Sequence, residues 1–251
     1  MACRAILFDL FDTLVRFQRD RLPAVRVNGE VVHSTVGHVH DVLRRWQPDV
    51  TLDRLYAALI ESWQEAERRR QVDHREVAAP ERFAHLFRCL ALDPDACPRD
   101  VFHGMLEAHR RELSKVAEFP LHHGPLLRRL AERHRLGVVS NFDYTPTALG
   151  ILETAGVAPL FTAILVSDAF GWRKPAPAIF EEALRRVGAR AEEALFVGDR
   201  ADIDVAGAQA VGIPAVWLNP EREALPAGIA PPTHEIRDLA EIEAIATATN
   251  V

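Results

Sequence analysis

Short runs of valine, isoleucine and leucine constrain the fold of this 251-residue chain more than any other feature. Turn-forming or polar residues bound each run, which is typical of strands buried inside a parallel sheet. Segments with the period of an amphipathic helix lie between the runs from about residue 125 onward. We predict five strands, within AILFD (5–9), RLGVVSN (135–141), TAILVSD (162–168), ALFVGD (194–199) and PAVWLN (214–219).

The alternation of strand and helix predicts an α/β fold with a Rossmann-like, doubly wound parallel sheet. Segment 177–188, PAIFEEALRRVG, is the clearest helix, because proline suits a first turn and glycine suits the end. Polar residues at the carboxyl ends of parallel strands meet in one crevice, where ligands bind. Six candidates fall at or just past such ends: Asp9, Ser140, Asn141, Asp168, Asp199 and Asp204.

Residues 18–118 interrupt this alternation, because they are mostly helix-patterned and rich in arginine, glutamate and histidine. We therefore expect a helical domain inserted into a core made of residues 1–17 and 119–251. A β-hairpin is expected near 22–33, since Asn28 and Gly29 lie between β-prone flanks.

The longest helix pattern of the insertion is TLDRLYAALIESWQEAERRR. Thr51 or Asp53 is the expected cap, and Leu55, Leu59 and Trp63 are expected to share a stripe. The terminal arginines, Arg68–Arg70, are expected to be solvated.

Composition excludes several classes of function. The net charge of −6 and the pI near 6.0 provide no basic surface for nucleic acid or an anionic membrane. Three cysteines without metal-ligand spacing indicate free thiols, which favours the cytoplasm. The apolar start is too short for a signal peptide, and the apolar window 147–167 is broken by Glu153, Gly156 and Pro159. We expect a cytoplasmic protein outside the membrane; oligomeric state is left open.

Four segments in order carry a family resemblance: FDLFDTL (8–14), VVSN (138–141), GWRKPAPAIF (171–180) and GDRADIDVAGA (198–208). Together they resemble the haloacid dehalogenase (HAD) superfamily, in the branch with a helical cap inserted after the first strand. The resemblance implies a hydrolase with a Rossmann-like core and a small-molecule substrate.

The same resemblance implies a role for each matching residue. Asp9 is the expected nucleophile, which splits one difficult displacement into two easier ones. Ser140 is expected to hold a phosphoryl oxygen, with Asn141 beside it. Lys174 is expected to neutralise the nucleophile and the transferred group. Because Lys115 is the only other lysine, a lysine at 174 suggests that a compact ammonium is required.

Three carboxylates, Asp9, Asp199 and Asp204, are expected to repel one another unless a cation lies among them. Oxygen ligands of this kind suit Mg²⁺. The resemblance implies direct ligation by Asp9, Asp199 and the Phe11 backbone carbonyl, with Asp204 acting through water. Asp202 is expected to be a solvated loop charge.

Phe11 is a departure from the family pattern. Most phosphatases of the superfamily have an aspartate at this position, which protonates the leaving oxygen and then activates water. Phenylalanine transfers no proton, and general acid–base catalysis contributes roughly a hundredfold to ten-thousandfold. Asp12 is not expected to substitute, because neighbours on an extended chain point to opposite sides, and we interpret it as a turn residue.

Three functions remain open at this point. A Mg²⁺-dependent phosphatase needs a substrate with a good leaving group, such as an aryl, acyl or anhydride phosphate. A carbon–halogen hydrolase is the alternative, since halide leaves unprotonated; GDRADID argues against it, because the dehalogenase branch works without metal. The third is a protein that binds a phosphorylated metabolite without turnover. Within the insertion, His33, His38 and His40 are candidate specificity residues. A lysine Schiff base there is not expected, since no lysine lies between Asp9 and Lys115.

Overall fold

The computed structural model of the chain describes residues 3–248. The chain forms two compact units. The core unit comprises the residues up to Arg16 and those from Phe119 onward, and the helical unit is Phe17–Glu118. This division lies within one residue of the predicted boundaries. That the two units act as a catalytic core and a cap stays a prediction.

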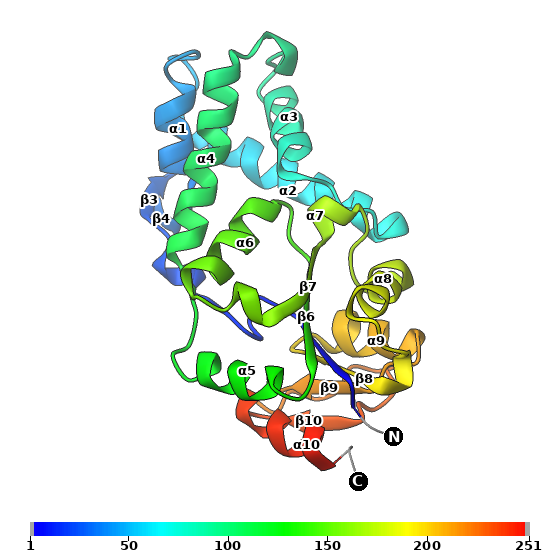
Figure 1. Cartoon of the computed structure of the whole chain (residues 1–251). Helices are drawn as coiled ribbons and strands as arrows, with labels where there is room; N and C mark the ends of the chain where they lie inside the picture. Colours follow the sequence, from blue (N-terminus) through cyan, green and yellow to red (C-terminus); the bar gives the residue numbers. More distant parts are fainter. Residues whose placement is uncertain (1–2, 249–251) are drawn as a thin grey trace. The chain divides into compact units, whose positions relative to one another are not determined.

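A six-stranded sheet forms the centre of the core unit, in the order β10-β9-β8-β1-β6-β7 (Figure 1). Every neighbouring pair is parallel. Its strands are β1 (Ala5–Phe8), β6 (Arg135–Ser140), β7 (Phe161–Val166), β8 (Ala194–Gly198), β9 (Ala215–Leu218) and β10 (His234–Ile236). The predicted α/β class and parallel, doubly wound sheet are confirmed. The sixth strand, β10, was not predicted.

Helices cover both faces of this sheet. Strand order runs one way from β1 to β7 and the other way from β8 to β10, so right-handed crossovers place the helices of these two halves on opposite faces. Figure 1 shows α8 and α9 on one side and α5 and α10 on the other. The helices are α5 (His123–Ala131), α6 (Thr145–Thr154), α7 (Ser167–Phe170), α8 (Pro177–Val187), α9 (Ala206–Ala210) and α10 (Ile242–Ala248), with short turns η3 (Ala158–Leu160), η4 (Ala191–Glu193), η5 (a π-helix, Ala201–Val205) and η6 (Leu239–Glu241).

The register of the three central strands brings their carboxyl ends to one edge. Phe8 of β1 lies opposite Val138 of β6 and Val197 of β8. The backbone N–H of Asp9 continues the ladder by donating to the Val197 carbonyl at 2.8 Å. Residues that follow these strands are therefore neighbours in space, although they are far apart in sequence.

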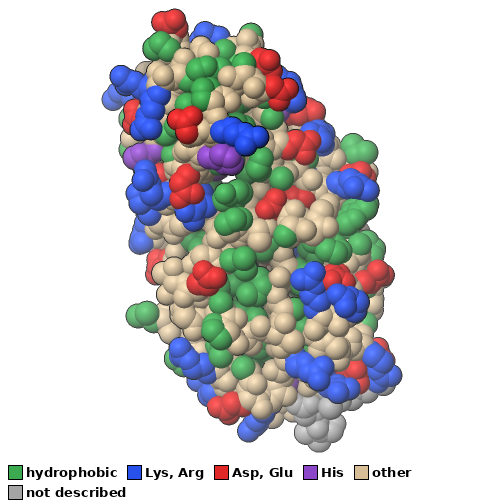
Figure 2. Space-filling view, turned by 45° about the horizontal axis from the view of Figure 1, so that its top comes forward, with side chains coloured by type: hydrophobic (Ala, Val, Ile, Leu, Met, Phe, Trp, Pro, Cys, Tyr) green, Lys and Arg blue, Asp and Glu red, His purple; other side chains and the backbone are tan. Residues whose placement is uncertain are grey.

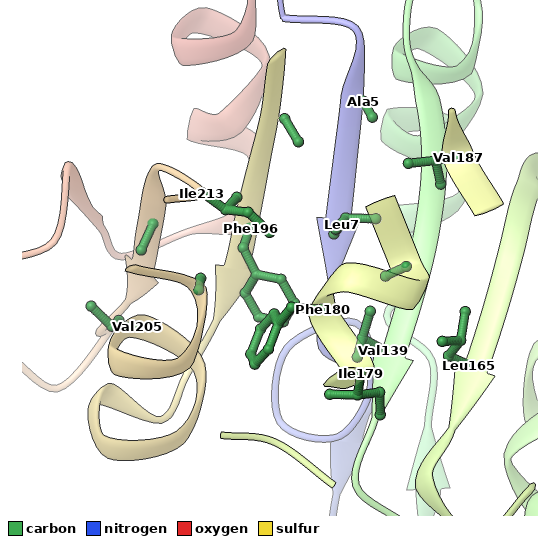
Figure 3. Packing of buried hydrophobic residues seen from close by; sticks show 14 of the residues in the cluster. Ala5, Leu7, Val139, Leu165, Ile179, Phe180, Val187, Phe196, Val205 and Ile213 are labelled. Atoms are coloured by element: carbon green, nitrogen blue, oxygen red, sulfur yellow. The ribbon is translucent and has the colours of Figure 1, made fainter. Parts of the chain in front are cut away.

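Apolar side chains from alternate strand positions pack against α8 (Figure 3). Leu7, Val139 and Phe196 point from the sheet toward Ile179 and Phe180 of the helix. The rings of Phe180 and Phe196 lie 5.0 Å apart at their centroids. Side chains on the opposite face, such as Ile6 and Phe8, are also fully buried. Burial of both faces explains why the strand sequences are continuously apolar.

The helical unit has its own apolar core, in which the buried side chains include Leu43, Leu55, Phe83, Phe87 and Met105. Helix α1 packs on α4, and α2 packs on α3. Its elements are η1 (Arg19–Arg21), β3 (Ala24–Val27), β4 (Glu30–His33), α1 (Val36–Leu43), α2 (Leu52–Asp73), α3 (Ala79–Cys89), η2 (Pro94–Ala96) and α4 (Arg99–Lys115). A two-stranded sheet of β2 (Arg16–Phe17) and β5 (Ala117–Glu118) forms where the chain enters and leaves this unit.

The predicted hairpin and the cap of the long helix are both present. β3 and β4 pair antiparallel around Asn28 and Gly29, which have φ of 48° and 86°. Left-handed backbone at both turn positions explains the Asn-Gly pair. At the start of α2, Thr51 accepts a hydrogen bond from the Arg54 N–H at 3.3 Å.

Two predictions about α2 were wrong. Leu55 and Leu59 are buried, but Trp63 is 54% exposed and does not share their environment. Of the three terminal arginines, Arg68 and Arg69 are exposed as expected, but Arg70 is buried and pairs with Glu76 at 2.7 Å. Glu76 lies beyond the end of α2, so the helical pattern of the sequence does not reveal that Arg70 has this partner.

Surface features agree with the composition. Acidic and basic side chains are interspersed over the face that Figure 2 shows, without a continuous basic area. The three cysteines are free thiols. Among residues 3–248, no helix has the length and apolar character needed to cross a bilayer.

Candidate active site

Three carboxylates meet at the carboxyl edge of the sheet. Asp9 follows β1, Asp199 follows β8, and Asp204 lies in the π-helix η5. One oxygen from each lies within 4.8 Å of the others. Asp9 and Asp204 are buried, and Asp199 is partly exposed. The structure therefore brings together the three acids proposed from sequence to hold a metal.

Backbone geometry after β8 places Asp204 against the strand end. Its backbone N–H donates to the Arg200 carbonyl at 2.7 Å, and its Oδ2 accepts from the Arg200 N–H at 3.1 Å. A Cβ on Gly198 would lie 2.3 Å from that same Oδ2. Glycine at 198 is therefore required for the carboxylate to approach the strand. Asp202 points away and pairs with Arg200 at the surface, as expected.

Lys174 supplies the positive charge of this cluster. The side chain is buried, and Nζ forms ion pairs with Asp9 and, at 2.7 Å, with Asp204. Nζ also lies 5.3 Å from the centroid of the Phe196 ring. One ammonium among three carboxylates leaves two negative charges uncompensated when all of the acids are ionised.

Proton affinities reflect this excess of negative charge. Burial, reinforced by Asp204 and Asp199 and opposed by Lys174, raises the pKa of Asp9 to about 8. Burial and the neighbouring Asp204 raise the pKa of Asp199 to about 6. For Lys174, burial acts to lower the pKa, but Asp204 and Asp9 outweigh it and the pKa is raised. The chain's own residues thus raise the pKa of Asp9 and Asp199, and a bound cation would act in the opposite direction.

The donor set fits a small divalent cation. Octahedral Mg²⁺ with bonds of about 2.1 Å accepts oxygen ligands no more than about 4.2 Å apart, and the carboxylate oxygens here are already near that spacing. Hard oxygen donors and a partly exposed side of the cluster suit a cation that keeps bound water. Asp9, Asp199 and Asp204 are the residues that would hold it. Ligation by the Phe11 carbonyl stays a prediction.

Two residues that the sequence did not single out fix Asp199. The Thr13 hydroxyl donates to Asp199 Oδ1 at 3.3 Å, and the indole N–H of Trp217 donates to the Asp199 backbone carbonyl at 2.8 Å. Both are buried. Trp217 is the next-to-last residue of β9, so an indole N–H near the carboxyl end of a core strand was the available signal.

Ser140 has the features of a ligand-binding hydroxyl. It ends β6, is fully buried, and its Oγ has no hydrogen-bond partner among residues 3–248. A buried hydroxyl without a partner is costly and rare, which makes a missing ligand the simplest explanation. Its expected contact with a phosphoryl oxygen stays a prediction.

The remaining strand-end candidates have structural partners. The Asn141 side chain bonds to the backbone of Lys174 at 2.7 and 2.8 Å. Asp168 accepts from the Thr145 N–H at 2.7 Å, at the start of α6. In the helical unit, His33 and His40 each bond to a backbone carbonyl, and His38 lies 3.9 Å from Glu112. A specificity role for these histidines stays a prediction.

Phe11 stands at the position of the missing acid, and its side chain has no group that can transfer a proton. Its ring is half-buried and packs on Phe142, with centroids 4.7 Å apart. The next residue, Asp12, is exposed and lies in a turn with φ of 61°, which confirms the prediction of a turn residue, although the backbone there is not extended. Phe11 and Phe142 therefore form an aromatic pair from the loops that follow β1 and β6.

Comparison with known proteins gives the chain a family. The family model for haloacid dehalogenase-like hydrolases matches residues 3–212. Glyceraldehyde 3-phosphate phosphatases of Pyrococcus furiosus and Methanopyrus kandleri are 29% and 28% identical; each alignment covers 86% of this chain, and 80% and 83% of those proteins.

Among solved structures, 2-haloacid dehalogenase from Pseudomonas syringae is 26% identical with a TM-score of 0.71, over 99% of both chains. The putative HAD-hydrolase YfnB of Bacillus subtilis, bound to magnesium, is 23% identical with a TM-score of 0.63, over 98% of this chain and 99% of that one. The second likeness supports the fold alone. From the family match over most of its length, this chain belongs to the haloacid dehalogenase-like hydrolases.

Proposed function

We propose that this chain is a Mg²⁺-dependent phosphatase that acts on a small phosphorylated metabolite through a phospho-Asp9 intermediate. The observation that carries the proposal is the buried cluster of three carboxylates and one lysine. The relatives named as glyceraldehyde 3-phosphate phosphatases support the reaction class. The substrate in their name is a small phosphate ester, which supports a small phosphorylated metabolite as the substrate class but not a particular leaving group.

Each residue of the cluster has a role in this proposal. Asp9 Oδ attacks phosphorus, and the bond from phosphorus to the leaving group breaks with its electron pair on the leaving oxygen. Lys174 reduces the charge on Asp9 and on the transferred group, and the Ser140 hydroxyl holds a phosphoryl oxygen. Water then attacks phosphorus, which releases phosphate and restores Asp9. When bound, Mg²⁺ would offset the charge of the carboxylates and the phosphoryl group.

Because position 11 is a phenylalanine, we propose a substrate whose leaving group needs no proton. Neither its ring nor the Phe142 ring beside it donates a proton to a departing oxygen. Aryl, acyl and anhydride phosphates release weakly basic groups and tolerate this loss. We therefore expect faster turnover of these substrates than of alkyl phosphates.

The test is a matched substrate panel. Aryl phosphate, acetyl phosphate and glyceraldehyde 3-phosphate are compared with excess Mg²⁺ and with excess chelator, using Asp9→Asn as the control. Phosphate release that requires both Mg²⁺ and Asp9, fastest with the activated substrates, supports the proposal. No Mg²⁺-dependent release from any of them would contradict it.

Halide displacement is the second candidate, favoured by the aromatic residue at position 11 and the likeness to 2-haloacid dehalogenase. Asp9 would attack carbon and halide would leave with its electron pair. Asp199 opposes this reaction, since its uncompensated charge repels an anionic haloacid. Chloride release from 2-chloropropionate in excess chelator would favour this candidate. Ligand binding unaffected by Asp9→Asn, with no product from either panel, would instead indicate a binding protein.

A further inference from the structure

The side-chain amide of Asn141 makes two hydrogen bonds to one residue, 33 positions away. Asn141 Nδ2 donates to the backbone carbonyl of Lys174 at 2.8 Å, and Asn141 Oδ1 accepts from the Lys174 N–H at 2.7 Å. Reversing the amide would place donor against donor and acceptor against acceptor, so the pair of contacts fixes its orientation. Like the backbone of a neighbouring strand, the side chain accepts one hydrogen bond from the Lys174 backbone and donates one to it.

Lys174 needs such an anchor because its charged group must be placed accurately at the end of a flexible side chain. Four rotatable bonds separate its Cα from Nζ, and ordering such a long side chain costs conformational entropy. The ammonium nevertheless pairs with both Asp9 and Asp204 while the side chain is buried. A fixed backbone at Lys174 reduces the number of positions that Nζ can reach.

Strand β6 supplies the fixed point. Asn141 follows directly after Ser140, the last residue of β6, so its position is set by the sheet. The following residue is also held, since the Phe142 N–H donates to the Ser167 hydroxyl at 2.9 Å. The amide of Asn141 thus connects the centre of the sheet to the loop that carries Lys174.

We propose that Asn141 is a positioning residue, whose side chain holds the Lys174 backbone so that the ammonium lies between Asp9 and Asp204. The amide keeps one N–H and one lone pair beyond these two bonds, so the kinetic test below distinguishes positioning of Lys174 from a direct contact with substrate. The kinetic part of the test rests on the proposed phosphatase function, and the spectroscopic part does not.

The spectroscopic test uses the fact that the chain has only two lysines, Lys115 and Lys174. Lysine-selective ¹³C and ¹⁵N labelling gives two sets of side-chain signals, which Lys115→Arg assigns. The side chain of Lys115 is 59% exposed, so its signal is an internal control. The Lys174 signal is expected to be shifted by the Phe196 ring, 5.3 Å from Nζ.

In Asn141→Ala, the Lys174 signals should move toward those of Lys115, while the Lys115 signals stay unchanged. Asn141→Asp keeps the acceptor and loses the donor, so it should give an intermediate shift. Unmoved Lys174 signals in both variants would overturn the proposal. Loss of the native Lys115 signal in both variants would also overturn the proposal, because substitution of a positioning residue should leave the fold intact.

The kinetic test is a double-mutant cycle between Asn141→Ala and Lys174→Met. Asn141→Ala should lower kcat about tenfold to a hundredfold with little change in KM. In the Lys174→Met background it should cause no further loss, because the residue acts through Lys174. Independent, multiplicative losses would show a direct contact with substrate and overturn the proposal. If the wild type hydrolyses no phosphate, the spectroscopic result still decides.

Discussion

The core unit and the helical unit both bury charged side chains, but they compensate these charges differently. In the core, Asp9, Asp199 and Asp204 share the single ammonium of Lys174, and the pKa values of Asp9 and Asp199 are raised. In the helical unit, buried Arg70 has Glu76 at 2.7 Å and the Val77 carbonyl at 2.9 Å.

Glu112, also buried in the helical unit, lies 2.7 Å from Lys115. Burial acts to raise its pKa, but Lys115 and nearby charges outweigh burial, and the pKa is lowered. Buried charge in the helical unit is thus compensated within the chain, whereas buried charge in the core is not. We infer that the first kind stabilises the fold and that the second kind is maintained for ligand binding and catalysis.

Asp9→Asn should have the largest effect on activity and no adverse effect on stability. Loss of the nucleophile is expected to reduce turnover on the order of ten-thousandfold or more. Removing one of three crowded carboxylates relieves repulsion, so the melting temperature without divalent cation should not fall. Steady-state kinetics and thermal unfolding measure the two effects. A clear drop in melting temperature would mean that this charge is structural, as in the helical unit.

Glu76→Gln tests the opposite case in the helical unit. Buried Arg70 loses its closer and more buried partner, while Glu67 stays at 3.4 Å, and breaking a buried ion pair costs up to about 3–5 kcal/mol of unfolding free energy. Denaturant unfolding measures the loss. The double variant Arg70→Met with Glu76→Gln should recover part of it, because no buried charge then lacks a partner. Equal stability of wild type and Glu76→Gln would contradict a structural role.

Phe11→Asp should separate the two classes of leaving group. A carboxyl at this position restores a proton donor, so turnover of alkyl phosphates should rise about a hundredfold or less, while aryl phosphate turnover changes little. Phe11→Leu is the matched control, since it also removes the ring contact with Phe142 but adds no acid. A similar change with both variants would show that the aromatic contact, not the proton, matters.

Trp217→Phe should have the smallest effect, confined to metal affinity. The variant keeps a ring but loses the hydrogen bond to the Asp199 carbonyl. Loss of a group that orients a ligand typically costs tenfold or more in metal affinity. Calorimetric titration with Mg²⁺ measures this loss. Trp46→Phe, in the helical unit, is the control and should leave the affinity unchanged; an equal loss in both would count against orientation of Asp199.

The sequence predicted the strands and the meeting point of the acids because both follow from local pattern. Apolar runs bounded by turn residues identify β1 and β8, and parallel pairing brings Asp9 and Asp199 to one edge. Strand β10 was missed because its three residues, His-Glu-Ile, carry no apolar run.

Contacts between distant residues explain the other differences. Arg70 is buried by Glu76, which lies beyond the helix end, and Asn141 pairs with Lys174 across 33 residues. Trp63 has helical spacing with two buried leucines but lies at the edge of their stripe and is exposed. Such outcomes depend on which neighbours the fold supplies, and periodicity in one segment does not contain that information.

Thermal stability as a function of Mg²⁺ concentration tests most directly whether the core carboxylates lack a cation. A ligand that binds only the folded state stabilises it increasingly above its Kd. The melting temperature of the wild type should rise steadily with Mg²⁺, and that of Asp199→Asn should rise much less. No rise in the wild type, or the same rise in both proteins, would contradict a cation site built from these acids.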